Sequence, residues 1–350
     1  MPKEIKDTKG KVVGTLLTDD DVSMDGLKGK KLAVIGYASQ GRAQSLCYRD
    51  SGVDVIVGQR KDQFYDLAVE DGWVPGETLF EIEEAAKQAD IVHLLIADLV
   101  QSTVYEEHIK PHLTEGKTLA FSHGFNITFG WIKPPEDVNV VMLAPKGPGV
   151  IVRREYEAGF GLPALWAVQQ DASGDAKDII LGMCKAVGAT RAGVLETSFR
   201  EECCSDLFGE QVDLCGGVTW MIKNAYETLI ARGYNPVLAY WEIHHELWGL
   251  LAPLSYKKGN VGMLRKVSVT ARDGAIQTGP YVMDKTVKER MGKSLDRIES
   301  GEYAEGLKKR YQEKGFGLVD EPLDEMDKTL LEVVGKQVRK VIWPNDPEVE

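Results

Sequence analysis

The sequence predicts an α/β protein in which a doubly wound sheet precedes an all-helical region. From the N-terminus to about residue 200, short β-branched runs alternate with amphipathic helical stretches. A glycine turn follows the first buried run. After Thr197 the strand signals stop, and the apolar residues recur at helical spacing. We therefore expect one domain over residues 1–198, a helical domain over 199–330 and a C-terminal tail over 331–350.

The expected strands are short runs rich in Val, Ile and Leu, each bounded by turn residues. Their alternation with helices is typical of a parallel sheet with helices on both faces. In the helical domain we expect turns at residues 233–236 and 256–260, and we interpret the acidic stretch 320–334 as a solvated terminal helix. The expected strands span residues 30–36, 53–58, 90–96, 117–123, 139–145, 165–170 and 191–197.

Composition excludes several classes of protein. The chain has 350 residues and a net charge of −12 without a basic cluster, which argues against nucleic acid or an anionic membrane as a partner. It contains no apolar run near 18 residues and no charged-then-apolar N-terminal signal, so we expect a soluble protein that is not exported. Five irregularly spaced cysteines form no disulfide framework and fit the reducing cytoplasm.

A dinucleotide-binding turn is predicted where the first buried strand ends. The sequence IGYASQGRAQSL reads Gly36-x-Ala38-x-x-Gly41 and leads into a helical stretch. A strand, a tight glycine turn and a helix N-terminus together present backbone N–H groups to a pyrophosphate, as in a Rossmann-like fold. Ala38 is a departure, because the middle position is normally Gly. The predicted cofactor contacts here are Gly36, Tyr37, Ala38, Ser39, Gln40 and Gly41.

Charged residues follow the second strand, where dinucleotide-binding domains contact the adenosine ribose. The sequence there is Gln59-Arg60-Lys61-Asp62. The cations Arg60 and Lys61 favour a 2′-phosphate and hence NADP(H). Asp62 would repel that phosphate if it pointed inward, so NAD(H) remains open.

Two pairs of acidic residues suggest a metal site. Asp206 and Glu210 are four residues apart, as are Glu242 and Glu246, so each pair lies on one helical face. The segments around them are otherwise apolar, and carboxylates that converge in a partly buried cleft need cations. Oxygen-only ligands suit Mg²⁺ or Mn²⁺, and the pattern predicts a two-metal site. The alternative is that both pairs lie on solvated helix faces.

Long motifs, ordered along the chain, resemble those of one family. They include RDSGVDVIVG (49–58), SHGFNI (122–127), PPEDVNVVMLAPKGPG (134–149), TRAGVLETSF (190–199), DLFGEQ (206–211) and LCGGVT (214–219). The chain resembles the short ketol-acid reductoisomerases, to about residue 320. The resemblance implies an oxidoreductase that uses NADP(H) and two Mg²⁺ ions. It converts 2-acetyl-2-hydroxy acids to 2,3-dihydroxy acids by alkyl migration and hydride transfer, in valine and isoleucine synthesis.

The resemblance also implies roles for residues of the first domain. His123 lies beside the nicotinamide, and Lys146 lies near the metal-bound water network. Asp98 and Gln101 line the nicotinamide ribose, and Gly149 of the APKGPG motif contacts the cofactor.

In the helical domain, the resemblance implies that Asp206 bridges both Mg²⁺ ions and that Glu210 binds one of them. Glu242 and Glu246 bind the other ion from a partner subunit, and Glu246 is a candidate proton acceptor. Ser268 contacts substrate oxygens. Because the helical domains of the family interlock, a homodimer or higher homo-oligomer is implied.

The sequence departs from the family near the predicted substrate site. Val150 and Gln169 stand where the family has His, and Ala97 stands where it has Pro. Residues 269–274 read Val-Thr-Ala-Arg-Asp-Gly in place of Asn-Thr-Ala-Glu-Tyr-Gly, so that Arg272 reverses a charge.

These departures leave alternatives open. The same scaffold could act on another metal-chelating 2-keto or 2-hydroxy acid, with Arg272 binding an extra carboxylate or phosphate. Arg272 could instead pair with Asp273 or with an acid of the partner chain. A third hypothesis is a non-catalytic dinucleotide-binding protein that keeps the fold.

Overall fold

The computed structural model describes residues 2–346 and 349. Residues 347, 348 and 350, in the predicted tail, lie outside the described residues. The chain divides into two compact units, Met1–Ser205 and Asp206–Glu350, which we call unit 1 and unit 2. Helix α8 (Phe199–Gly209) crosses the division. None of the described helices has the length and apolar character needed to cross a membrane.

The described strands of unit 1 form one ten-stranded sheet, in the order β1-β2-β10-β9-β8-β7-β6-β3-β4-β5. Each predicted run contains a strand. The strands are β1 (Lys3–Lys6), β2 (Val12–Leu17), β3 (Leu32–Ile35), β4 (Val55–Gly58), β5 (Leu79–Phe80), β6 (Ile91–Leu94), β7 (Thr118–Phe121), β8 (Asn139–Pro145), β9 (Ala164–Gln170) and β10 (Val194–Glu196).

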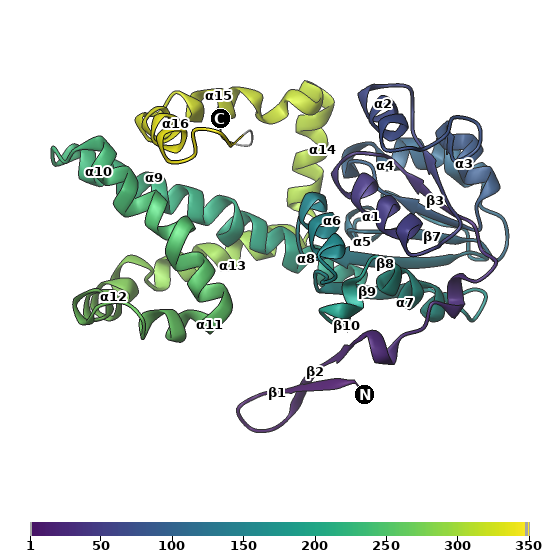
Figure 1. Cartoon of the computed structure of the whole chain (residues 1–350), viewed down its shortest axis with the longest axis horizontal. Helices are drawn as coiled ribbons and strands as arrows, with labels where there is room; N and C mark the ends of the chain where they lie inside the picture. Colours follow the sequence, from purple (N-terminus) through teal and green to yellow (C-terminus); the bar gives the residue numbers. More distant parts are fainter. Residues whose placement is uncertain (1, 347–348, 350) are drawn as a thin grey trace. The chain divides into compact units, whose positions relative to one another are not determined.

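The sheet is mixed, so the prediction of a parallel sheet is wrong at one side. β3, β4, β5, β6, β7 and β8 pair in parallel, but β9 pairs antiparallel with β8, and β2 pairs antiparallel with both β1 and β10. Alternation of strands and helices does not fix strand direction, because a helix can connect strands of either orientation. The hairpin of β1 and β2 at the sheet edge (Figure 1) was not predicted, because its residues are largely exposed.

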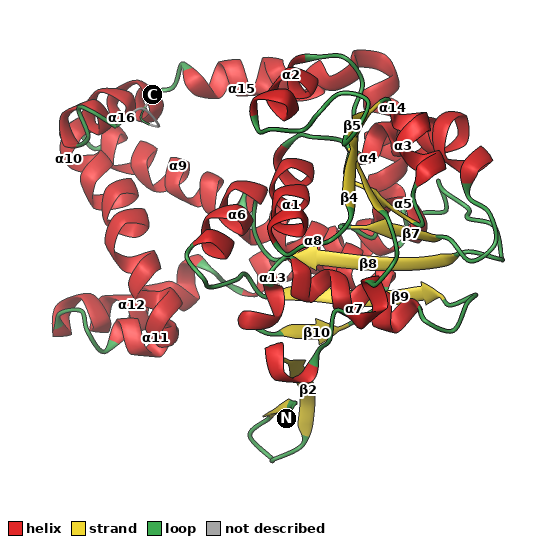
Figure 2. Ribbon diagram, turned by 45° about the vertical axis from the view of Figure 1, so that its right-hand side comes forward, coloured by secondary structure: helices red, strands yellow, loops and turns green. Residues whose placement is uncertain are grey.

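Helices lie against both faces of the sheet (Figure 2). Successive residues of β3 show this: Leu32 and Val34 pack into one apolar cluster, while Ala33 and Ile35 pack into another. Residues of α1 and α7 belong to the first cluster, and residues of α3 belong to the second. These helices are α1 (Ser39–Asp50), α2 (Gln63–Glu70), α3 (Ile82–Gln88), α4 (Asp98–Val104), α5 (Phe125–Thr128), α6 (Gly149–Glu157) and α7 (Ala176–Ala186).

Unit 2 is helical in its described residues, as predicted. Its chain turns at Gly233 (φ +82°) and kinks at Gly259 (φ +71°), within the two predicted turns. π-helical segments span Glu210–Leu214, Trp241–His245 and Leu247–Leu251. The helices are α9 (Gly216–Ala231), α10 (Pro236–Tyr240), α11 (Ala252–Leu264), α12 (Val269–Val282), α13 (Lys285–Glu299), α14 (Glu302–Lys314), α15 (Asp320–Asp327) and α16 (Leu330–Ile342).

The last helix is not simply solvated, which corrects the interpretation of the acidic stretch. Leu331 and Val338 of α16 are buried against Ile222 and Tyr226 of α9 and against Tyr240 of α10. The acidic residues lie mainly on α15, whose residues are largely exposed. The acidic residues therefore lie mainly on α15, whereas the buried apolar residues lie on α16.

A histidine lies in the centre of the sheet of unit 1. His93 of β6 is fully buried, with Nδ1 3.2 Å from the Tyr48 hydroxyl and Nε2 3.1 Å from Ser122 Oγ. Burial disfavours the imidazolium and lowers the pKa of His93 to about 3.

We expect His93 to make the protein less stable in mild acid. Its pKa in the folded state lies below the value of about 6.5 in the unfolded chain, so the unfolded state binds the proton more tightly. The contribution of neutral His93 is complete above about pH 6.5 and is lost toward pH 3, with a slope of up to about 1.4 kcal/mol per pH unit. Urea unfolding at pH 7.5, 6 and 5 measures it. The free energy of unfolding of the wild type, relative to that of His93→Leu, should fall as the pH falls. A relative value that stays constant between pH 7.5 and pH 5 would contradict the prediction.

Candidate functional site

The predicted glycine turn joins β3 to α1 with almost no spare volume. Gly36 has a φ of +100°, and a Cβ atom built there would lie 2.7 Å from the Leu95 carbonyl oxygen. A Cβ atom at Gly41 would lie 2.0 Å from the carbonyl oxygen of Gly36. Only glycine fits at both positions, and the turn leaves the first N–H groups of α1 without helical partners. The backbone therefore fits a phosphate at this helix N-terminus.

Ala38 and Ser39 are the exposed residues of the turn, whereas Tyr37 is buried. Ala38 has extended backbone angles (φ −79°, ψ −160°), which a residue with a methyl group adopts without strain. The departure from glycine at position 38 is therefore compatible with the turn. The Tyr37 hydroxyl lies among core groups, donating to Asp71 at 2.9 Å and accepting from Trp73 Nε1 at 2.7 Å. The backbone N–H of Tyr37 donates to Gln59 Oε1 at 2.9 Å, so the polar groups of Tyr37 are engaged within the protein.

The loop after β8 packs directly on the glycine turn. Gln40 Nε2 donates to the Gly147 carbonyl at 2.9 Å, and the Gly149 N–H donates to Ser39 Oγ at 3.2 Å. A Cβ atom at Gly149 would lie 2.1 Å from the Ser39 carbonyl oxygen. The APKGPG motif therefore uses Gly149 to bring two loops into backbone contact.

The predicted ribose-lining residues lie at the start of α4. Gln101 is buried, donates to the Ile96 carbonyl at 2.8 Å and accepts from Asn126 at 3.0 Å. Asn126 also donates to the Asp98 carbonyl at 3.0 Å. Gln101 thus holds the turn between β6 and α4, while the half-buried Asp98 side chain remains partly accessible at the helix start. Asn126 was not predicted, because nothing in SHGFNI distinguishes an amide that fixes a neighbouring loop.

Asp62 caps α2 instead of pointing at a ligand. Its carboxylate accepts from the Phe64 and Tyr65 N–H groups at 2.9 and 3.3 Å and lies 2.8 Å from Arg60 Nε. Burial raises the pKa of Asp62, but these contacts outweigh burial and lower it. The Arg60 side chain remains 77% exposed, and Lys61 is exposed. Both cations are therefore accessible, whereas the acid is engaged.

A buried carboxylate that the sequence analysis missed organises the predicted catalytic residues of unit 1. Glu202 of α8 is 1% exposed, and its carboxylate lies 3.1 Å from His123 Nδ1 and 3.2 Å from Lys146 Nζ. It also accepts from the Gly124 N–H at 2.9 Å. Glu202 could not be recognised from the sequence, because the acidic stretch around it is typical of an exposed helix end.

Glu202 keeps its neighbours charged. Burial opposes ionisation of His123, but its contacts with Cys203 and Glu202 raise the pKa of the imidazole to about 11. Burial likewise opposes ionisation of Glu202, while His123 and Lys146 lower the pKa of its carboxyl group. The structure thus brings together His123 and Lys146 as two cations around one buried anion.

The predicted metal ligands occupy two helical segments. Asp206 lies on α8, one turn after Glu202, and Glu210 begins the π-helical segment that follows. Glu242 lies within the segment Trp241–His245, and Glu246 follows it. Among the described residues of unit 2, the two pairs do not gather into one cluster of ligand atoms. Each pair by itself offers oxygen ligands of the kind that suits Mg²⁺.

Ser268 and Arg272 lie at the joint between α11 and α12. Ser268 is exposed and caps α12, its Oγ accepting from the Ala271 N–H at 3.1 Å. The Arg272 guanidinium donates to the Leu264 carbonyl at 3.0 Å and to the carbonyls of Arg265 and Val267 at 3.4 Å. Arg272 therefore binds the carbonyls that end α11 and does not pair with Asp273.

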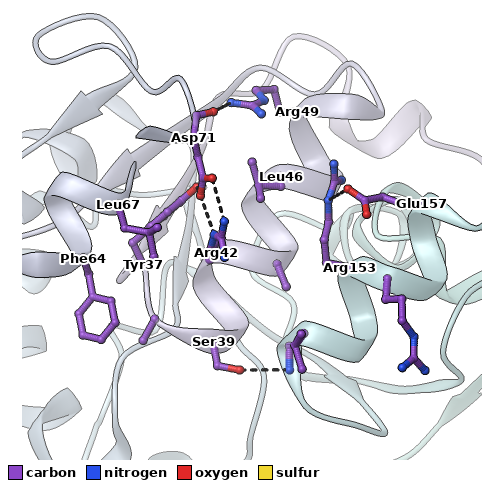
Figure 3. Close-up of a pocket in the computed structure, with 15 residues that line it drawn as sticks. Tyr37, Ser39, Arg42, Leu46, Arg49, Phe64, Leu67, Asp71, Arg153 and Glu157 are labelled. Carbon is purple, nitrogen blue, oxygen red and sulfur yellow. Dashed lines mark hydrogen bonds and ion pairs between the residues drawn. The ribbon is translucent and has the colours of Figure 1, made fainter. Parts of the chain in front are cut away.

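A cavity of about 700 Å³ lies between α1, α2 and α6 (Figure 3). It includes Ser39 and Gly149, so it opens beside the glycine turn. Its cations are paired: Arg42 with Asp71 at 2.6 Å, and Arg153 with Asp50 at 2.7 Å. The glycine turn therefore borders a cavity whose charged side chains are largely paired with one another or with neighbouring acids.

Both units match family models. Residues 26–193 match the NADPH-binding domain of acetohydroxy acid isomeroreductase, and residues 199–343 match the C-terminal domain of ketol-acid reductoisomerase. The chain is 49% identical over 325 residues to the ketol-acid reductoisomerase (NADP(+)) of Methanocaldococcus jannaschii, covering 92% of this chain and 96% of that protein. It is 47% identical over 334 residues to the enzyme of the same name from Sulfolobus acidocaldarius, covering 95% and 99%.

A solved structure agrees with these matches. The NADH-preferring ketol-acid reductoisomerase from an uncultured archaeon superimposes with a TM-score of 0.89 at 41% identity, covering 93% of this chain and 98% of that one. A semialdehyde dehydrogenase NAD-binding protein from Cupriavidus necator, at 17% identity and a TM-score of 0.58, shares the fold alone.

We expect Arg60→Ala to weaken NADPH binding about tenfold and to leave NADH binding nearly unchanged. Arg60 is accessible and Asp62 is engaged, so the guanidinium can bind a 2′-phosphate, a contact worth roughly 1.5 kcal/mol. Titration with each nucleotide measures the effect. Arg297→Ala is the matched control, because Arg297 is also exposed and also paired with a neighbouring acid, Glu302, but lies on α13 of unit 2. A wild type that binds NADH more tightly than NADPH would overturn the assignment.

We expect Arg272→Ala to lower the free energy of unfolding by about 0.5 to 1.5 kcal/mol, because it removes the hydrogen bonds to carbonyls at the joint between α11 and α12. Arg272→Lys should recover only part of the loss, since an ammonium group lacks the planar fork that reaches several carbonyls. Denaturant unfolding of the two variants decides this. Equal stability of Arg272→Ala and the wild type would show that the contacts contribute nothing.

Proposed function

Since this chain belongs to the ketol-acid reductoisomerase family, we propose that it converts 2-acetyl-2-hydroxy acids to 2,3-dihydroxy acids with NADP(H) and Mg²⁺, as in valine and isoleucine synthesis. The observation that carries the proposal is the identity of 49% to a named enzyme over 92% of the chain. The glycine turn, the buried Glu202 group and the two acidic pairs supply residues suited to that chemistry.

We assign the metal ligands to Asp206 and Glu210 together with Glu242 and Glu246 of the partner subunit. Carboxylate oxygens suit Mg²⁺, and bound Mg²⁺ would chelate and polarise neighbouring substrate oxygens. The separation of the two pairs within unit 2 supports a site completed by a second chain. Glu246 is assigned as the group that takes the substrate hydroxyl proton.

The residues of unit 1 would hold the cofactor and the developing charge. The turn of residues 36–41 would bind the pyrophosphate, and bound nicotinamide would supply the hydride. Lys146 offers positive charge to an oxygen that becomes anionic, and Glu202 orients that ammonium group. His123 is held by the same carboxylate, beside the position assigned to the nicotinamide.

The position of Arg272 favours the ordinary substrates over an anionic alternative. Its guanidinium binds three backbone carbonyls, so it does not stand free to bind an extra carboxylate or phosphate. Ser268 remains the candidate for contacting substrate oxygens, since it is exposed at the start of α12.

We further assign a homodimer or higher homo-oligomer in the cytoplasm. Large apolar side chains of unit 2 are exposed, including Trp220, Trp241 and Trp248 at 52%, 48% and 46%, and a second helical unit would cover such a surface. The chain holds free cysteines, four of them buried, which fits a reducing compartment. Sedimentation of the purified protein measures the assembly.

The decisive experiment is NADPH consumption with 2-acetolactate and Mg²⁺. We expect Asp206→Asn to lose over a hundredfold in rate, about 3 kcal/mol of transition-state stabilisation, because it removes a charge from the proposed bridging ligand. Asp324→Asn, in an exposed acid of α15, is the matched control and should retain activity. Near-normal Mg²⁺-dependent turnover of Asp206→Asn would remove the two-metal assignment.

A further inference from the structure

A chain of hydrogen bonds connects the glycine turn to the residue that precedes His123. Gln40 Nε2 donates to the Gly147 carbonyl at 2.9 Å. Gln44 Nε2 donates to Gln40 Oε1 and to Ser122 Oγ, each at 3.0 Å. A carbonyl can only accept, so Gln40 must direct its Nε2 at Gly147 and its oxygen at Gln44. Gln44 is thereby fixed as a donor to Ser122.

The opposite side of Ser122 is fixed by buried neutral groups. Tyr48 and His93 are fully buried, and burial raises the pKa of the phenol and lowers that of the imidazole. The buried Tyr48 hydroxyl needs an acceptor, and His93 Nδ1 lies 3.2 Å away. His93 therefore carries its proton on Nε2, which lies 3.1 Å from Ser122 Oγ, and a hydrogen bond to the Phe121 carbonyl also acts on the imidazole.

Ser122 Oγ thus accepts from both sides, which occupies its lone pairs. The Ser122 hydroxyl proton is then available to an acceptor other than Gln44 and His93. Ser122 is half-buried and follows β7, while Gln44 beneath it is fully buried. The remaining hydroxyl proton is therefore directed away from Gln44 and His93, in a residue that is partly accessible.

That edge is where a dinucleotide would lie. β3, β4, β6, β7 and β8 are parallel, so the turn after β3, Arg60 after β4 and Ser122 after β7 share one edge. The strand order changes direction between β3 and β6, the position at which doubly wound sheets bind dinucleotides. Arg60 lies on the β4 side and Ser122 on the β7 side, which correspond to the adenosine and nicotinamide halves.

We propose that Ser122 is a cofactor-binding residue whose hydroxyl donates to an oxygen on the nicotinamide half of the dinucleotide, held as a donor by Gln44 and by the Tyr48–His93 pair. The inference deepens the proposed function and rests on it for the identity of the ligand. Ser122 touches the cofactor, whereas Tyr48, His93 and Gln44 are positioning residues.

The first test measures cofactor affinity without substrate. NADPH fluorescence titration should show Ser122→Ala binding about tenfold more weakly than the wild type, since one hydrogen bond is lost. Ser122→Thr keeps a hydroxyl group and should stay within about threefold of the wild type. As an internal control, 2′,5′-ADP lacks the nicotinamide ribose and should bind equally to all three proteins. An NADPH affinity of Ser122→Ala within about twofold of the wild type overturns the proposal.

The second test removes one of the two donors that fix the Ser122 hydroxyl. His93→Leu removes the Nε2–H group, so Ser122 Oγ then accepts from Gln44 alone and its proton is no longer held in one direction. NADPH affinity should fall although His93 is buried, and His93→Leu combined with Ser122→Ala should bind no more weakly than Ser122→Ala alone. Effects that multiply in the double variant contradict the coupling. If His93→Leu fails to bind 2′,5′-ADP, the comparison of Ser122→Ala with Ser122→Thr decides alone.

Nitrogen-15 NMR of the histidines gives a direct readout of the tautomer. The wild type should show His93 protonated on Nε2 and bare on Nδ1 at neutral pH. The signal is assigned among the six histidines by its loss in His93→Leu. An Nδ1–H tautomer in the wild type overturns the proposal. A protein that binds NADPH through Ser122 but does not act on 2-acetolactate would reject the proposed function and keep this inference.

Discussion

The close approach of backbone segments at the N-terminus of α1 is the constraint on which the site of unit 1 depends. Cβ atoms at Gly41 and Gly149 would lie 2.0 and 2.1 Å from carbonyl oxygens of residues Gly36 and Ser39. Neither contact could be relieved by a side-chain rotation, because backbone stands on both sides. The loops after β3 and β8 therefore pack as one surface, and Gln40 and Ser39 link them by hydrogen bonds. That surface in turn determines the orientation of every side chain linked to Gln40.

Electrostatics imposes the second constraint. A carboxylate that is 1% exposed is stable only with counter-charges and hydrogen bonds, and Glu202 has His123, Lys146 and the Gly124 N–H around it. Removing one of these would leave the buried carboxylate with fewer counter-charges or hydrogen-bond donors. The same arrangement fixes His123 and Lys146 relative to each other, so the requirement for a stable fold also positions the residues assigned to chemistry.

The sequence predicted the features that depend on local chain chemistry. Buried strands, the glycine turn and the helical unit follow from periodicity and from residues such as Gly36, and the structure has them. It did not predict the antiparallel pairing of β9, because strand direction depends on tertiary connection. Nor did it single out Glu202, His93 or Asn126. Their significance lies in partners 25 or more residues away, which residue type and spacing do not encode. The assigned roles of the metal ligands and of Ser268 remain predictions.

The charge reversal at Arg272 shows how a departure from family pattern can be satisfied locally. A cation in the first turn of a helix opposes the helix dipole, so Arg272 should destabilise α12 by itself. The guanidinium instead reaches back to the carbonyls of Leu264, Arg265 and Val267, where the C-terminal end of α11 favours positive charge. The favourable interaction of the guanidinium with the C-terminal end of α11 thereby offsets its unfavourable interaction with the N-terminal end of α12. Because the charge is accounted for within unit 2, the departure does not require a substrate with an additional anionic group.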